Sequence, residues 1–183
     1  MIKIKLGIDI DEVVCKLMDS MLPLVNYEND TVYDEEDITE YNLQVVGIKE
    51  PGKLLKKYKN MFKTAKAVDG ADRFINRLYK DGHKIILISK RDSYDGIYAD
   101  TIQWFKKKGI PFDKMLLYQK NKVNKAHMEK IDIFIDDKAE TVEQMQKSGI
   151  DSYVFDRPWN KNYKHLKRVY SWGDIYDEVR KKT

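Results

Sequence analysis

The chain opens with an alternating run of apolar residues that ends in two carboxylates. Every second position from Ile2 to Ile10 is apolar, which predicts a β-strand. Asp9 and Asp11 lie two residues apart at the end of this strand, so their side chains point to the same side. Two like charges held together are unfavourable without a positive partner, and carboxylate oxygens suit Mg²⁺. The simplest candidates for a group bound there are therefore a divalent metal and a phosphate, although an isolated Asp-x-Asp also fits a solvated strand end.

Four further apolar runs predict strands, and segments with helical periodicity separate them. The predicted strands cover residues 83–89, 114–118, 131–136 and 151–155. The first of these runs is almost continuously apolar, which is typical of parallel strands covered on both faces. The predicted helices cover residues 70–80, 94–108, 121–130, 139–148 and 172–181. This alternation predicts an α/β fold, a doubly wound (Rossmann-like) five-stranded parallel sheet with right-handed crossovers.

A block between the first two predicted strands interrupts the alternation. It has no strong strand pattern, and helices are predicted over 13–27, within 31–41 and over 51–62. We therefore expect a small helical cap inserted after the first strand, at residues 15–66. Residues 1–14 and 67–183 then form the core domain.

Polar side chains stand at the carboxyl ends of three predicted strands. They are Asp9 and Asp11 after the first, Ser89 after the second, and Asp136 and Asp137 after the fourth. Lys122 and Lys125 lie in the connection that leads to the fourth strand. Because doubly wound sheets bind ligands at this edge, we expect these side chains to share one site.

Four carboxylates, a hydroxyl and a lysine at one sheet edge suit metal-dependent phosphoryl transfer. One carboxylate can attack phosphorus and form an aspartyl-phosphate. A second acid can protonate the leaving oxygen and later activate water. Mg²⁺ takes a few hard oxygens from the protein, while a hydroxyl and an ammonium can hold the phosphoryl oxygens. The residue types thus predict a reaction class and leave the substrate open.

The order of these residues resembles the signature of the haloacid dehalogenase superfamily of phosphohydrolases. The segments that carry the resemblance are Ile8-Asp-Ile-Asp-Glu-Val-Val14, Leu87-Ile-Ser89, a lysine before the fourth strand, and Phe134-Ile-Asp-Asp137. The likeness covers essentially the whole chain outside the insertion. An insertion directly after the first motif is the first cap position of this superfamily. The resemblance implies an Mg²⁺-dependent phosphatase.

The resemblance implies a role for each of the polar residues at the strand ends. Asp9 would be the nucleophile and an Mg²⁺ ligand, and Asp11 the general acid/base with its backbone carbonyl on the metal. Ser89 would hold a phosphoryl oxygen. Asp136 would be the third protein ligand to Mg²⁺, with Asp137 bound directly or through water.

The lysine of the third motif has two candidates, and one position departs from the pattern. Lys122 stands fourteen residues before Asp136, a spacing common in relatives with this layout, and we favour it. Lys125 stands eleven residues before, close to the spacing in more compact relatives. Glu12 replaces the glycine that many relatives carry, and we expect its side chain to narrow the mouth of the site.

Three other segments resemble the nucleotidase branch that includes 5′(3′)-deoxyribonucleotidases. They are Ile88-Ser-Lys-Arg91, residues 104–114, and Phe155-Asp-Arg-Pro-Trp-Asn160. They imply a (deoxy)nucleoside monophosphate as substrate and a 5′-nucleotidase as the enzyme. Ser89, Lys90 and Arg91 would bind that substrate, with a surface salt bridge as the alternative role for Arg91. For Trp159 we favour packing over stacking on a base.

Composition narrows the choice of partners. The net charge of +4 and a pI near 8.8 suit anionic substrates rather than identify a dedicated nucleic-acid binder. No apolar run approaches the roughly 20 residues that span a bilayer, so we expect no membrane partner. The single Cys15 and the absence of a signal-peptide pattern favour a cytoplasmic protein. A homodimer stays open.

Several other functions share part of this pattern. A dehalogenase on the same fold would not need the second acid, Asp11. A receiver-type signalling module uses similar groups, but its acids and lysine follow a different order along the chain. A phosphatase for another small phosphorylated metabolite stays an alternative. So does a phosphatase for nucleic-acid ends, which would follow the backbone through basic residues 161–168.

Overall fold

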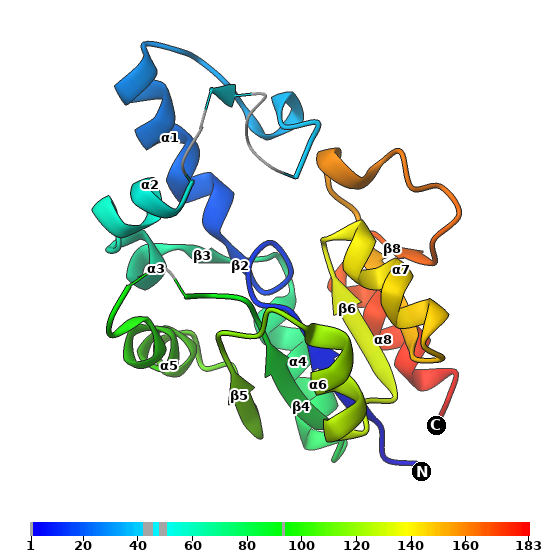
Figure 1. The fold of residues 1–183 in the computed structure, drawn as a ribbon. Helices are drawn as coiled ribbons and strands as arrows, with labels where there is room; N and C mark the ends of the chain where they lie inside the picture. The colour runs from blue at the N-terminus through cyan, green and yellow to red at the C-terminus, as the bar shows by residue number, and fades with distance from the viewer. Residues whose placement is uncertain (1, 42–45, 48–50, 93) are drawn as a thin grey trace.

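The computed structural model of the chain describes residues 2–41, 46–47, 51–92 and 94–183. Within these residues, six parallel strands form a sheet in the order β5–β4–β1–β6–β7–β8 (Figure 1). The strands are β1 (Lys5–Ile8), β4 (Lys84–Ile88), β5 (Lys114–Leu116), β6 (Ile133–Asp136), β7 (Asp151–Phe155) and β8 (Arg168–Val169). Because β1 lies inside the sheet, its carboxyl end is flanked by the ends of β4 and β6.

Helices cover both faces of this sheet (Figure 1). One face carries α4 (Ala71–Lys80) and α8 (Trp172–Arg180), and the other carries α6 (Lys122–Glu129) and α7 (Ala139–Lys147). In β4, Ile85 and Leu87 enter the core on the first face, whereas Ile86 and Ile88 enter the core on the second. Alternate side chains of a strand point to opposite faces, so a strand covered on both is apolar throughout. The predicted doubly wound parallel sheet is confirmed.

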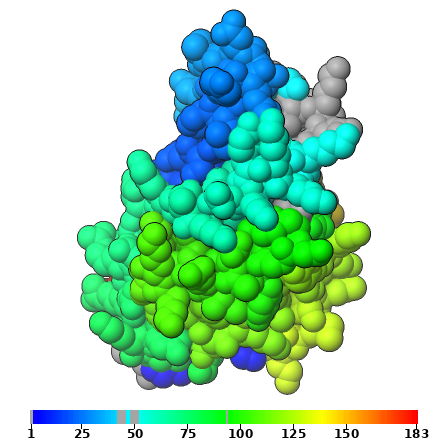
Figure 2. Space-filling model, turned by 90° about the vertical axis from the view of Figure 1, so that its left-hand side faces the viewer, coloured from blue at the N-terminus to red at the C-terminus, as the bar shows by residue number. Residues whose placement is uncertain are grey.

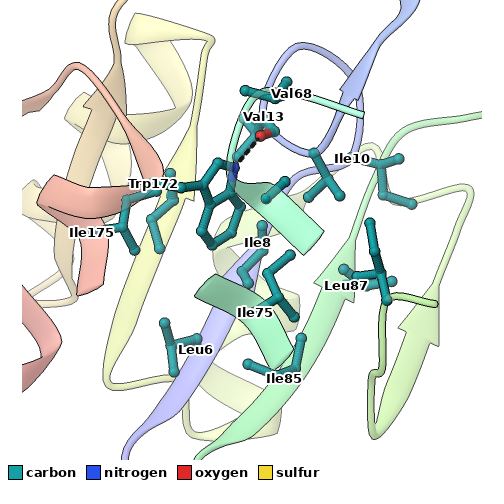
Figure 3. Close-up of a cluster of buried hydrophobic side chains, with 14 of the residues drawn as sticks. Leu6, Ile8, Ile10, Val13, Val68, Ile75, Ile85, Leu87, Trp172 and Ile175 are labelled. Carbon is teal, nitrogen blue, oxygen red and sulfur yellow. Dashed lines mark hydrogen bonds between the residues drawn. The ribbon is translucent and has the colours of Figure 1, made fainter. Parts of the chain in front are cut away.

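The larger core lies between the sheet and the face covered by α4 and α8 (Figure 3). Leu6 and Ile8 of β1 are fully buried in it. Trp172, at the start of α8, packs beside them and donates its indole N–H to the Val13 carbonyl at 2.8 Å. This bond attaches the last helix to the loop that follows Asp11.

The predicted core helices are all present, and their ends differ from prediction by three residues or fewer. The largest difference is in α5 (Ile97–Lys108), which begins three residues late. Our count of five strands was wrong, because β8 pairs with β7 as a sixth. With only two residues inside a basic segment, β8 has no strand pattern of its own. None of the helices in the described ranges is long and apolar enough to cross a membrane.

The inserted segment forms a lobe above the carboxyl edge of the sheet (Figure 1, Figure 2). Its elements are α1 (Leu17–Asn29), the 3₁₀-helix η1 (Glu35–Asp37), α2 (Pro51–Lys57) and α3 (Met61–Thr64). At its base, β2 (Cys15–Lys16) pairs antiparallel with β3 (Lys66–Ala67). The strand β2 lies at the start of the cap predicted at 15–66, and β3 lies at its end. The domain boundaries themselves stay a prediction.

The lobe has its own apolar cluster, built mainly from α1 and α3. Its buried members include Met18, Met21 and Phe62, and Ile97 and Trp159 join it from the larger body. The predicted helix over 13–27 begins only at α1, because β2 is held extended by its pairing with β3. The predicted helix over 51–62 is divided into α2 and α3.

Candidate active site

Three carboxylates from the ends of two neighbouring strands lie together at the carboxyl edge of the sheet. Asp9 follows β1, while Asp136 ends β6 and Asp137 follows it. One oxygen of each lies within 4.8 Å of the others, and all three residues are buried. The backbone N–H of Asp9 donates to the Ile135 carbonyl at 2.9 Å, which aligns the two strand ends. The pairing of β1 with β6 therefore creates this acidic cluster.

Lys122 supplies the cation that lies between two of these acids. Its ammonium is 2.8 Å from Asp9 Oδ2 and 2.8 Å from Asp136 Oδ2. Burial opposes the charged form, but the carboxylates of Asp136 and Asp9 overcome it and raise the pKa of Lys122. Asn121 starts α6 by accepting from the backbone N–H of Asn124 at 3.0 Å, which places Lys122 in the first turn.

Lys125, the other candidate for this role, lies on the same helix and is half-buried. It forms no ion pair with any residue that the structure describes. The structure thus brings Lys122, and not Lys125, to the acidic cluster. The contact of Lys122 with the phosphoryl group stays a prediction.

The acidic cluster has the properties expected of a site for a hard divalent cation. Asp9 Oδ1 is buried and has no hydrogen-bond partner among the described residues. Burial raises the pKa of Asp9 to about 6, with Asp136 and Asp11 adding to the shift and Lys122 opposing it. Burial also raises the pKa of Asp137 well above its usual range, as do the neighbouring acids. The three carboxylates carry more negative charge than the single ammonium of Lys122 can balance, and Mg²⁺, which prefers hard oxygen ligands, would neutralise the excess.

Asp11 is separate from this cluster and is held by an arginine. The Arg91 Nε donates to both oxygens of Asp11, at 3.1 and 3.0 Å, and Nη2 donates to Oδ1 at 2.7 Å. The Asp11 side chain is 29% exposed, whereas that of Arg91 is 1% exposed. We expected Arg91 at the substrate or in a surface salt bridge. The salt bridge exists, but it is buried, because Arg91 lies beneath Asp11.

Ser89 and Lys90, the other residues expected at the substrate, follow β4. Ser89 is buried, and its hydroxyl accepts from the backbone N–H of Arg91 at 3.4 Å. Lys90 is exposed and lines a cavity of about 580 Å³ between the cap and the core. The apolar wall of this cavity comes from Leu17, Met18, Met21, Leu55, Phe62 and Trp159. Its polar wall includes Asp11 and Asp137, so the cavity opens onto both groups of acids.

Glu12 fastens the cap to the turn that carries Asp11. It has a left-handed backbone, with φ at 58°, and its buried carboxyl accepts from the Met18 N–H at 2.7 Å near the start of α1. Arg157 donates to the Glu12 carbonyl through Nε at 3.1 Å and Nη2 at 2.6 Å. Burial raises the pKa of Glu12 to about 8. Glu12 also lines the cavity, where its effect on substrate size stays a prediction.

Two residues that we did not assign to the site support Asp137. The Trp159 indole donates to Asp137 Oδ2 at 3.0 Å, and the Asn160 amide donates to the Asp137 carbonyl at 2.8 Å. Trp159 does pack, as we favoured, because its ring belongs to the apolar cluster of the cap. Its position just after β7, at the same sheet edge, was the signal that could have indicated the polar contact as well.

Comparison with known proteins gives a consistent result. The family described as "5' nucleotidase, deoxy (Pyrimidine), cytosolic type C protein" matches residues 2–183. A protein of Chlorobaculum tepidum named "Putative 5'(3')-deoxyribonucleotidase" is 26% identical over 190 residues, covering 97% of this chain and 90% of the relative.

Solved structures share the fold. One described as a predicted phosphatase from Clostridium acetobutylicum has a TM-score of 0.69 at 13% identity, covering 99% of this chain and all of that one. A haloacid dehalogenase superfamily hydrolase from Ehrlichia chaffeensis has a TM-score of 0.60 at 12% identity, covering 99% and 98%. At these identities the likeness concerns the fold.

Proposed function

The chain belongs to the cytosolic type C family of deoxy (pyrimidine) 5′ nucleotidases, which are haloacid dehalogenase-type phosphatases, and we propose that it hydrolyses (deoxy)nucleoside monophosphates with Mg²⁺ as cofactor. The observation that supports this most is the buried acidic cluster with Lys122 between Asp9 and Asp136. Asp9 Oδ1 is buried and accepts no hydrogen bond from any residue that the structure describes. That is the arrangement expected of a metal-binding nucleophile.

The reaction proceeds in two steps on Asp9. In the first, a carboxylate oxygen of Asp9 forms a bond to phosphorus, the bond to the leaving oxygen breaks, and Asp11 gives that oxygen a proton. In the second, Asp11 takes a proton from water as the water attacks phosphorus. The aspartyl-phosphate bond then breaks, which releases inorganic phosphate and restores Asp9.

The remaining residues hold charge during both steps. The Ser89 hydroxyl and the Lys122 ammonium bind the phosphoryl oxygens, where negative charge is concentrated. Bound Mg²⁺, held by Asp9, Asp136 and Asp137 and by the backbone carbonyl of Asp11, would neutralise charge on the same oxygens. The exposed Lys90 contacts the anionic substrate at the cavity wall.

The cavity beneath the cap supports a nucleotide as the substrate. Its apolar lining is suited to the base of a nucleotide, while its acids and Lys90 are suited to the charged end. Closure of the cap excludes water from the phosphoryl group, and the cap residues determine which base and sugar enter. A cytoplasmic location remains a prediction from the sequence, and the oligomeric state stays open.

A panel of phosphate esters tests the proposal. Phosphate release would be measured for 5′- and 3′-(deoxy)nucleoside monophosphates, sugar phosphates, short oligonucleotides and 4-nitrophenyl phosphate, with Mg²⁺ and with chelator. We expect Mg²⁺-dependent release that favours the nucleotides, and its loss in Asp9→Asn. Asp72→Asn, an exposed position on α4, is the control. Full activity of Asp9→Asn would overturn the nucleophile, and release only from the other esters would overturn the nucleotide assignment.

A further inference from the structure

We propose that Arg91 is a positioning residue that orients the Asp11 carboxylate for proton transfer to the leaving group, rather than a residue that binds the substrate phosphate. The inference rests on the proposed function, in which Asp11 protonates the leaving oxygen. It assigns Arg91 a role in one chemical step, and that step can be measured separately from substrate binding and from folding.

The geometry of the guanidinium supports this assignment. Nε and Nη2 make three hydrogen bonds to the two oxygens of Asp11, and this fixes the plane of the carboxylate as well as its location. Nη1 donates to Thr101 Oγ1 at 3.0 Å. The Thr101 hydroxyl donates to the Ile97 carbonyl at 2.7 Å, so its single proton is already used. Its oxygen therefore acts as acceptor for Arg91, and all three guanidinium nitrogens have protein acceptors.

Arg91 is more deeply buried than Asp11, which favours a role in positioning the Asp11 carboxylate. The Arg91 side chain is only 1% exposed, while the Asp11 side chain keeps 29% exposure at the cavity. The guanidinium therefore holds Asp11 from the protein side and leaves part of the carboxylate open to the substrate. A residue that bound phosphate would need exposed N–H groups. Arg91 and the half-buried Lys138 also line the cavity, but among these three cations Lys90 is the exposed one.

The position of Arg91 also depends on the cap. Its guanidinium carbon lies 5.1 Å from the centre of the Phe62 ring, which belongs to α3 and to the apolar cluster of the cap. A planar guanidinium can lie over a ring and bind a carboxylate in its own plane at the same time. The ammonium of lysine is a point charge and cannot reproduce this arrangement, so Arg91→Lys preserves charge while removing orientation.

The identity of the leaving group separates this role from others. When a nucleotide reacts, the nucleoside is the leaving group, and its sugar oxygen would depart as an alkoxide without the proton from Asp11. The leaving group of the aryl ester, 4-nitrophenolate, is stable without a proton. The ratio kcat/KM covers only the steps up to departure of the leaving group, so it excludes hydrolysis of the aspartyl-phosphate. Loss of orientation at Asp11 should therefore lower kcat/KM for the nucleotide much more than for the aryl phosphate.

The experiment compares Arg91→Gln and Arg91→Lys with the wild-type enzyme on one deoxynucleoside monophosphate and on 4-nitrophenyl phosphate. We expect Arg91→Gln to lower kcat/KM about 100-fold for the nucleotide and only slightly for the aryl ester. Arg91→Lys should lie between Arg91→Gln and wild type. Arg157→Gln is the matched control, because Arg157 is also largely buried near Asp11 but donates to the Glu12 carbonyl. Its effect should be equal on both substrates.

Several outcomes would overturn the inference. Equal losses on the two substrates would mean that Arg91 is structural. A rise in KM for both, with kcat unchanged, would mean that it binds the phosphate. If Arg91→Gln does not fold, the same comparison is made with Arg91→Lys. A wild-type ratio of kcat/KM between the nucleotide and the aryl phosphate in that variant would also overturn the inference. Inactivity of the wild-type enzyme on both esters would instead count against the proposed function itself.

Discussion

The indole N–H of Trp159 donates to the carboxylate of Asp137 at 3.0 Å. The ring of the same residue packs in the apolar cluster of the cap, beside residues of α1 and α3. One side chain therefore contacts both the cap and an acid of the proposed metal site. Because a neighbouring hydrogen bond fixes the direction of a carboxylate oxygen, Trp159 is placed to influence how Asp137 meets a cation.

We predict that Trp159→Phe weakens Mg²⁺ binding about 10-fold, since it keeps an aromatic ring but removes the N–H that orients Asp137. Isothermal titration calorimetry on the protein without substrate measures this directly. Trp104→Phe is the control, because that indole donates instead to the Ala65 carbonyl at 2.8 Å. Equal Mg²⁺ affinities in the two variants would show that the Trp159 hydrogen bond has no such role.

The two lysines of α6 are expected to differ sharply. Lys122→Met should reduce phosphate release by about 100- to 1,000-fold, because it removes the ammonium between Asp9 and Asp136. Lys125→Met should stay close to wild type, since Lys125 has no ion pair with a described residue. Steady-state rates of phosphate release at saturating Mg²⁺ compare the two variants with the wild type. A larger loss in Lys125→Met would reverse the assignment.

Glu12 should make stability depend on pH. Burial raises the pKa of its carboxyl from 4.5 to about 8, so the folded state binds this proton more tightly than the unfolded state. The resulting stabilisation is complete below pH 4.5 and is lost as the pH rises through about 8. Glutamine mimics the protonated form at every pH. Each unit of pKa difference corresponds to about 1.4 kcal/mol of unfolding free energy.

We therefore expect Glu12→Gln to exceed wild type in unfolding free energy by roughly 2–4 kcal/mol at pH 9, with a gap that shrinks toward pH 5. Urea denaturation in chelator, at a series of pH values, gives the two curves. Glu140→Gln, at an exposed position of α7, serves as the control. A gap that does not change with pH would contradict the prediction.

A side chain at Gly7 should destabilise the fold. It lies opposite Phe134 in the β1–β6 ladder, and a Cβ there would come within 2.5 Å of Phe134 Cδ2. Gly7→Ala should lower the unfolding free energy by about 1–3 kcal/mol through overpacking. Adding Phe134→Leu should recover part of the loss, so the two changes together should cost less than their sum. Additive values in chemical denaturation would show that the two positions do not clash.

Local pattern was sufficient to predict most of the fold. Alternating apolar residues located β1, and the continuous apolar run located β4, because burial on one or both faces leaves a direct periodicity in the chain. Asp9 and Asp136 were expected near one another because the carboxyl ends of parallel strands share an edge. The motifs at the same strand ends carried the resemblance to the haloacid dehalogenase-type phosphatases, and that membership is confirmed.

The contacts that complete the site depend on long-range packing. Arg91 reaches Asp11 across 80 positions of sequence, and Trp159 reaches Asp137 across 22. Neither contact leaves a periodic signal, because each requires a strand order and a side-chain direction that are set only when the sheet, the helices and the cap pack together. Periodicity and residue type therefore located the acids. The folded core brought β1 beside β6 and placed an arginine, a lysine and an indole against those acids.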